Sequence, residues 1–209
     1  MVLYICKLYS GKYFFHRKMD HVVLFFILLL IWLTPFSFGY RDPDQDVLNT
    51  CLDAQNHKLK PGPESSLYKH CTPWKYRSCC NKETSELVHG SGHYNFNKNH
   101  CSNIKNLSSN CEKYFIRDAC FYECSPNVGP WIVSVNSKSR NERFYGVPLC
   151  KSDCITWYEA CKDDYTCSDN WGQGWDWSTG VNKCKMGSVC EPIKDKFKNA
   201  QNFCEKVCE

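Results

Sequence analysis

The sequence predicts a small, disulfide-rich α+β globular domain, in which short helices and short strands are joined by long loops. The chain of 209 residues contains 17 cysteines, a density typical of secreted disulfide scaffolds. Several cysteines are four residues apart, which is about one helical turn. The segments between the predicted helices are rich in glycine, asparagine and aromatic residues. These observations favour one domain that is held together by up to eight disulfides.

The first 39 residues have the pattern of a leader and signal peptide. Residues 22–33 form an unbroken apolar run of 12 residues, shorter than the roughly 20 that span a bilayer. Arg17 and Lys18 precede this run, and small residues near position 39 predict cleavage before Tyr40. We expect a secreted or extracellular mature domain over 40–209, without a transmembrane segment. Attachment to the cell surface would need a C-terminal anchor beyond Glu209.

Three segments carry helical patterns. In residues 110–124, cysteine and aromatic side chains share one face with Asp118, and Pro126 ends the helix. Residues 150–161 repeat the pattern with cysteine, tryptophan and tyrosine, and a third helix is predicted within 195–208. The remaining long segments are expected to be loops or short strands. These segments are residues 83–99, 136–147 and 168–182.

Loss of Cys6 with the leader leaves 16 cysteines, an even number that permits complete pairing. No two have C-x-x-C spacing, so neither a structural zinc site nor a thioredoxin-like redox pair is expected. The paired set is Cys51, Cys71, Cys79, Cys80, Cys101, Cys111, Cys120, Cys124, Cys150, Cys154, Cys161, Cys167, Cys184, Cys190, Cys204 and Cys208.

Several classes of function are disfavoured. The chain has no metalloprotease, nucleophile-elbow or phosphate-loop motif, and its cysteines are assigned to disulfides, so an enzyme is not expected. The formal net charge of +4 is spread along the chain, which argues against a nucleic-acid partner. The five histidines after the leader are expected at the surface or in local hydrogen bonds, with no metal bound.

Aromatic and charged residues form the candidate binding site. Tryptophans at 171, 175 and 177 alternate in a glycine-rich segment, which is typical either of a cleft for a flat ligand or of core packing. Asp118 lies on the inward stripe of its helix and therefore needs a partner. That partner is either an arginine, such as Arg117, Arg140 or Arg143, or a bound ligand.

The residues from Cys51 to Cys208 resemble the folate receptor family, which also includes riboflavin carriers and the egg receptor Juno. The segments that carry the resemblance are LDAQNHKLKPGPE (52–64), CTPWKYRSCC (71–80), FIRDACFYECSPNVGPWI (115–132), VPLCKSDCITWYEACKDDYTC (147–167) and NWGQGWDWSTGVNKC (170–184). The resemblance implies disulfides 51–79, 71–120, 80–124, 101–190, 111–161, 150–208, 154–204 and 167–184.

The resemblance also implies a ligand and its contacts. Asp118 would bind the pterin edge, and Arg140 and Arg143 would contact its carbonyl. The pocket aromatics would be Tyr94, Phe96, Tyr122, Trp171, Trp175 and Trp177. Folate or a related pterin is thus the expected ligand and no other cofactor is expected, with riboflavin carriage as one alternative. The other is Juno-like adhesion in gamete recognition through a cell-surface protein partner. The one N-x-[ST] sequon predicts glycosylation at Asn106.

Overall fold

The computed structural model describes residues 47–90, 93–137 and 140–207. The leader, the predicted cleavage site and Cys208 lie outside these ranges. The 3-10 helices are η1 (Lys69–Trp74), η2 (His93–Asn95) and η3 (Gly129–Trp131), and the α-helices are α2 (Lys82–His89), α3 (Ser109–Cys124), α4 (Lys151–Cys161), α5 (Ile193–Phe197) and α6 (Ala200–Lys206). The strands are β1 (Ile132–Ser137), β2 (Arg140–Phe144), β3 (Tyr165–Thr166), β4 (Trp175–Asp176), β5 (Lys183–Cys184) and β6 (Glu191–Pro192). This set of short elements confirms the α+β expectation.

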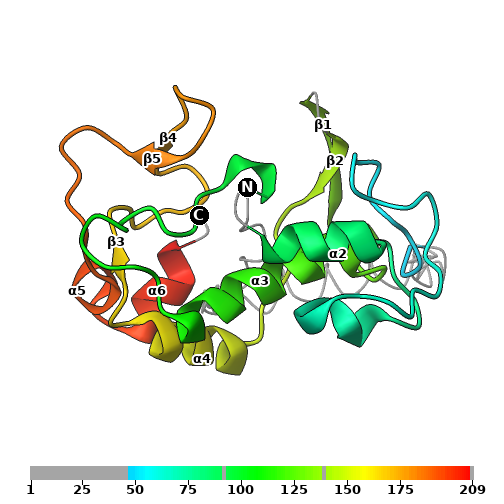
Figure 1. Ribbon diagram of the computed structural model, residues 1–209, viewed down its shortest axis with the longest axis horizontal. Coiled ribbons are helices and arrows are strands. Elements are labelled where there is room, and N and C mark those ends of the chain that lie inside the picture. The colour runs from blue at the N-terminus through cyan, green and yellow to red at the C-terminus, as the bar shows by residue number, and fades with distance from the viewer. Residues whose placement is uncertain (1–46, 91–92, 138–139, 208–209) are drawn as a thin grey trace, which may run out of the picture.

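Helix α3 is central, with α2 above it and α4 below it in Figure 1. It begins where the Ser108 side chain accepts a hydrogen bond from the Cys111 amide, which satisfies one of the free donors of the first turn. It ends at Ser125, because the residue before a proline is disfavoured in the α conformation. Both boundaries agree closely with the sequence prediction for residues 110–124.

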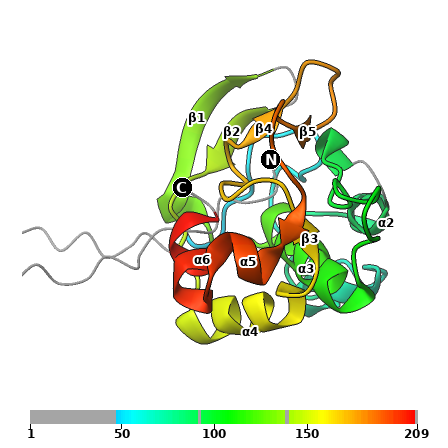
Figure 2. The ribbon, with the colours of Figure 1, turned by 90° about the vertical axis from the view of Figure 1, so that its left-hand side faces the viewer.

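The C-terminal segment contains two short helices instead of the single one predicted. Lys198 has a φ of 69°, in the left-handed region, which ends α5. Asn199 then starts α6 by accepting a hydrogen bond from the Asn202 amide. This change of direction lets both helices pack together beside α4, as Figure 2 shows.

The prediction of loops or strands for residues 83–99 was wrong, because α2 occupies the first part of that segment. Asn81 caps the helix by accepting from the Thr84 amide. Polar residues cover part of the buried face: Thr84 donates to the Asn56 carbonyl, and Ser85 accepts from the Tyr68 amide. Polar residues on the inner face conceal the apolar period by which a helix is usually recognised.

Three two-stranded antiparallel sheets complete the described part of the chain. The β1–β2 hairpin is the longest, and its register shifts between Ser134 and Ser137. The β4–β5 pair joins Trp175 to Cys184, next to the disulfide from Cys184 to Cys167. Strands therefore occur within both later segments that were expected to be loops or short strands.

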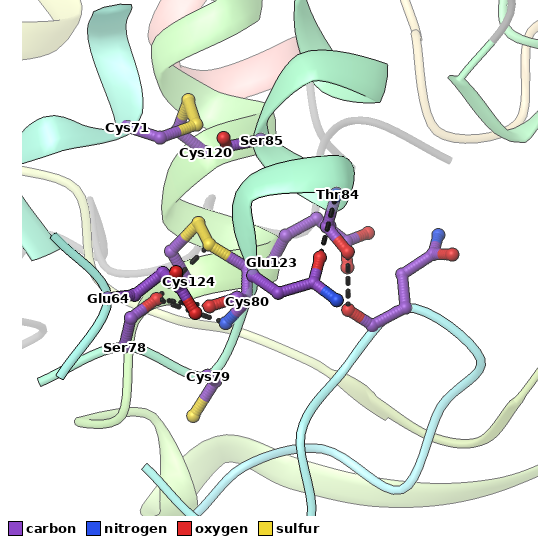
Figure 3. Close-up of a disulfide and its surroundings, with 12 residues drawn as sticks. Glu64, Cys71, Ser78, Cys79, Cys80, Thr84, Ser85, Cys120, Glu123 and Cys124 are labelled. Atoms are coloured by element: carbon purple, nitrogen blue, oxygen red, sulfur yellow. Dashed lines mark hydrogen bonds between the residues drawn. A yellow bond between two sulfur atoms is a disulfide. The ribbon is translucent and has the colours of Figure 1, made fainter. Parts of the chain in front are cut away.

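Disulfides connect these short elements. Seven are formed in the described part of the chain, and they are the pairs 51–79, 71–120, 80–124, 101–190, 111–161, 154–204 and 167–184. All seven match the implied scheme. Figure 3 shows Cys71–Cys120 and Cys80–Cys124, which tie α3 to earlier segments. Cys150 is exposed and has no disulfide partner in the described ranges, and its implied partner, Cys208, lies outside them.

The largest core cluster lies where α4, α5 and α6 meet the N-terminal half of α3. Trp157, Trp171 and Phe203 form its centre, with ring centroids 5.7–6.4 Å apart. A second cluster lies under α2, and a third lies between α3 and the β1–β2 hairpin around Tyr122 and Phe144. No helix in the described ranges is long and apolar enough to cross a membrane. The third cluster positions the candidate site.

Candidate ligand-binding site

Asp118 lies on the buried stripe of α3, as the sequence predicts, and is only 6% exposed. Phe115, three residues earlier, and Tyr122, four residues later, lie on the same face of the helix. A carboxylate in such an aromatic setting is stable only with hydrogen-bond donors or positive charge nearby. Helix α3 thus presents an acceptor of hydrogen bonds between two aromatic rings.

Tyr122 connects α3 to the hairpin. Its ring is 3% exposed and lies 4.9 Å from the Phe144 ring, measured between centroids. Its hydroxyl accepts a hydrogen bond of 2.9 Å from Nη1 of Arg140. The structure therefore brings together two predicted site residues that are 18 positions apart in the chain.

The two predicted arginines have different surroundings. Side chains alternate between the two faces of a strand, so Arg140 and Phe144 leave β2 on the side of Tyr122. Arg143 leaves on the other side, and its guanidinium lies 5.8 Å from the ring centre of Tyr145. A spacing of three residues would align side chains on a helix, but it does not do so on a strand.

Tyr94 packs edge-on against Tyr122. Its ring centroid is 6.2 Å from that of Tyr122 and 4.3 Å from the imidazole of His93. Burial, with a smaller effect from the negative charge of Glu123, raises the pKa of the Tyr94 phenol above its ordinary value, so the hydroxyl stays neutral. Tyr94 thus presents a neutral aromatic group beside Tyr122.

Glu123, which follows Tyr122, is completely buried and lies between two histidines. Its Oε1 is 3.0 Å from Nε2 of His93, and its Oε2 is 3.3 Å from Nδ1 of His57. His57 Nε2 also donates to the Tyr122 carbonyl at 3.2 Å. The sequence analysis missed this cluster, because its members come from three distant segments and no local period relates them. The histidines were expected at the surface or in local hydrogen bonds, and this was wrong for His57 and His93, whose side chains are buried and contact residues distant in the sequence.

Of the three tryptophans in the glycine-rich segment, two are buried and one is exposed. Trp171 is 1% exposed, and its indole nitrogen donates to Thr166 Oγ1 and the Ser168 carbonyl. This placement agrees with the core-packing alternative for that residue. Trp175 is 5% exposed and contacts Phe96 edge-on, whereas Trp177 is 39% exposed.

The glycines of this segment serve its own folding. A Cβ at Gly174 would lie 1.8 Å from Ser168 Oγ, so only glycine fits there. At this position the glycine permits a close approach of the backbone to the loop that carries Ser168.

A small hollow adjoins the site between α2, η2 and α3. It offers about 20 Å³ to water, and it is lined by Val88, Gly90, His93, Phe96, Lys98, Phe115 and Ala119. The amine of Lys98 lies 3.2 Å from a carboxylate oxygen of Glu112. Since Phe115 and Ala119 flank Asp118 along α3, the hollow lies next to the turn of α3 that carries Asp118.

Comparison with known proteins relates the chain to one family. The model of the folate receptor family matches residues 50–209. Folate receptor gamma of Homo sapiens is 46% identical over 162 residues, which are 77% of this chain and 65% of that protein. Folate receptor alpha of Homo sapiens is 41% identical over 186 residues, 87% of this chain and 71% of that protein. Riboflavin-binding protein of Dromaius novaehollandiae is 36% identical over 159 residues, 76% of this chain and 64% of that protein.

Proposed function

Because this chain belongs to the folate receptor family, we propose that it is an extracellular, non-enzymatic protein that binds folate or a related pterin. The observation that carries this proposal is the buried carboxylate of Asp118, set between aromatic rings on α3. The chain spans 65% of the length of folate receptor gamma, so its ligand is inferred from the residues that are present.

The chemistry of a pterin matches this site. A pterin carries a ring N–H beside an exocyclic amine, and two such donors suit the two oxygens of one carboxylate, here Asp118. Its carbonyl suits a guanidinium, which Arg140 offers near Tyr122. The flat rings suit the neighbouring aromatic side chains, such as Tyr122, which Arg140 contacts, and Tyr94, which lies beside Tyr122.

Asp118 would also discriminate between folate and riboflavin. Riboflavin is the ligand named for the relatives at 36% and 34% identity. A flavin has no exocyclic amine, so it would leave one carboxylate oxygen of Asp118 without its donor. A pterin supplies both donors. The chemistry of this residue therefore favours the folate-type ligand.

Fluorescence titration tests the ligand class. Folate, pteroate and riboflavin are titrated separately into the purified mature protein while tryptophan emission is recorded. Saturable quenching by folate and pteroate supports the proposal. A stronger response to riboflavin would favour a flavin carrier. No saturable response to any of the three would leave adhesion to a protein partner as the better hypothesis.

Substitution of the carboxylate tests the mechanism. Removing one partner of a charged, buried hydrogen bond typically costs about 2–5 kcal/mol, so Asp118→Ala should weaken folate binding by roughly 30-fold or more. Asp118→Asn should also weaken it, because the amide places a donor opposite a ligand donor. Asp153→Ala removes an exposed helical aspartate and serves as the matched control. A folded Asp118→Ala protein that binds folate as tightly as wild type would refute the assignment.

A further inference from the structure

His57, Glu123 and His93 form a buried cluster beside Tyr122. His57 Nε2 faces the Tyr122 carbonyl at 3.2 Å, and its Nδ1 faces Glu123 Oε2 at 3.3 Å. The Tyr122 carbonyl can only accept, so Nε2 of His57 carries a proton, whereas Nδ1 makes no hydrogen bond with Glu123. The histidine to which the Glu123 carboxylate is hydrogen-bonded is His93.

A neutral His93 has only one tautomer that suits its surroundings. Its Nε2 lies 3.0 Å from Glu123 Oε1, which can only accept, so the proton is on Nε2. The other nitrogen, Nδ1, is therefore an acceptor. The residue is only 7% exposed, and Nδ1 is buried without a hydrogen-bond partner among the residues that the structure describes.

His93 lines the hollow between α2, η2 and α3. A space of about 20 Å³ holds one small polar group, such as a water or an amino group, and cannot hold an aromatic ring. Buried polar atoms in proteins nearly always have a partner. The size of the hollow and the unpartnered nitrogen of His93, a residue that lines it, therefore point to a small hydrogen-bond donor as the occupant.

The backbone around His93 is held in an uncommon conformation. Tyr94 and Asn95 have φ values of 52° and 57°, both in the left-handed region that large side chains rarely adopt. Such strain persists where surrounding contacts hold the chain in place, and it occurs preferentially at ligand sites. Here the contacts are the bond from His93 to Glu123 and the packing of Tyr94 on Tyr122.

We propose that His93 is a ligand-contacting residue that determines specificity: its Nδ1 accepts a hydrogen bond from the exocyclic amino group of the bound pterin, and that amino group is seated in the hollow. Asp118 then binds the same donor-rich edge from the adjacent turn of α3. The inference rests on the proposed function, and it adds a second acceptor to that site. It predicts preference for heterocycles that carry an N–H donor at this edge.

Three substitutions separate contact with the ligand from support of the fold. His93→Gln places an amide donor near the position of Nε2 and keeps a partner for Glu123, but it has no atom at the position of Nδ1. His93→Asn places an acceptor near the position of Nδ1 but does not reach Glu123. His93→Phe removes both groups. His70→Gln, at an exposed histidine, is the matched control.

Folate affinity is measured for all variants, and circular dichroism checks the fold. We expect His93→Gln to weaken folate about tenfold while its melting temperature stays near that of wild type. His93→Asn should bind folate more tightly than His93→Gln despite a lower melting temperature, and His70→Gln should match wild type. In ¹⁵N NMR spectra of the wild type, the His93 Nδ1 resonance should shift when folate is added.

Three results would overturn the inference. Equal folate affinity of wild type and folded His93→Gln would show that the hollow holds only water. An Nδ1 resonance that folate leaves unchanged would exclude direct contact. Failure of the wild type to bind any pterin would refute the proposed function itself, and the inference with it. The first two results leave the proposed function intact, so the two failures are distinguishable.

Discussion

Replacement of Glu123 by alanine should destabilise the domain more than any exposed carboxylate does. Glu123 is completely buried and is within 3.3 Å of His57 and 3.0 Å of His93. Its removal leaves the buried nitrogens of His57 and His93 that face it without this carboxylate, at a position that is closed to water. Removing one partner of a buried pair typically costs about 3–5 kcal/mol. For a domain of this size, that corresponds to a fall in melting temperature of roughly 6–20 °C.

Thermal unfolding followed by circular dichroism, without reductant, measures this effect. The matched control is Glu86→Ala in α2, where the carboxylate pairs with Lys82 at 3.8 Å and is 49% exposed. An exposed pair contributes only about 0–1 kcal/mol, so this control should melt within a few degrees of wild type. Glu123→Gln keeps one acceptor, so its melting temperature should lie between those of Glu123→Ala and Glu86→Ala. If Glu123→Ala melted no lower than Glu86→Ala, the argument that this buried cluster stabilises the fold would be wrong.

Three further predictions concern acid stability, pairing and modification. Burial lowers the pKa of His100 from 6.5 to about 4, so the unfolded chain takes up this proton first as the pH falls. Up to about 3 kcal/mol of stability should be lost between pH 6.5 and 4, and His100→Gln should reduce that loss in denaturant titrations at pH 7 and pH 4.5. Cys150 should be paired with Cys208, so alkylation of the denatured, unreduced protein should label neither; labelling of both would contradict the pairing. Asn106 is exposed beside Asn99, and glycosidase treatment of the secreted protein should increase its gel mobility; an unchanged mobility would contradict the modification.

Local patterns in the sequence determined the central helix and its inward face. The one-turn spacing of Cys120 and Cys124, the stripe through Asp118 and Tyr122, and Pro126 predict α3 almost to its ends. These signals are local, because helical period and helix termination depend on residues within one or two turns. The even cysteine count predicts complete pairing, but the partners came from the family resemblance, since counting leaves the connectivity open.

The tertiary structure alone decided which distant residues meet. His57, His93 and Glu123 come from separate segments, and no sequence period connects them. The burial of Trp171 and the exposure of Trp177, six residues later, likewise depend on whether α6 or solvent lies opposite each ring. Periodicity describes the faces of single elements, whereas a binding site depends on the packing between elements. That packing follows from the burial of apolar surface over the whole chain.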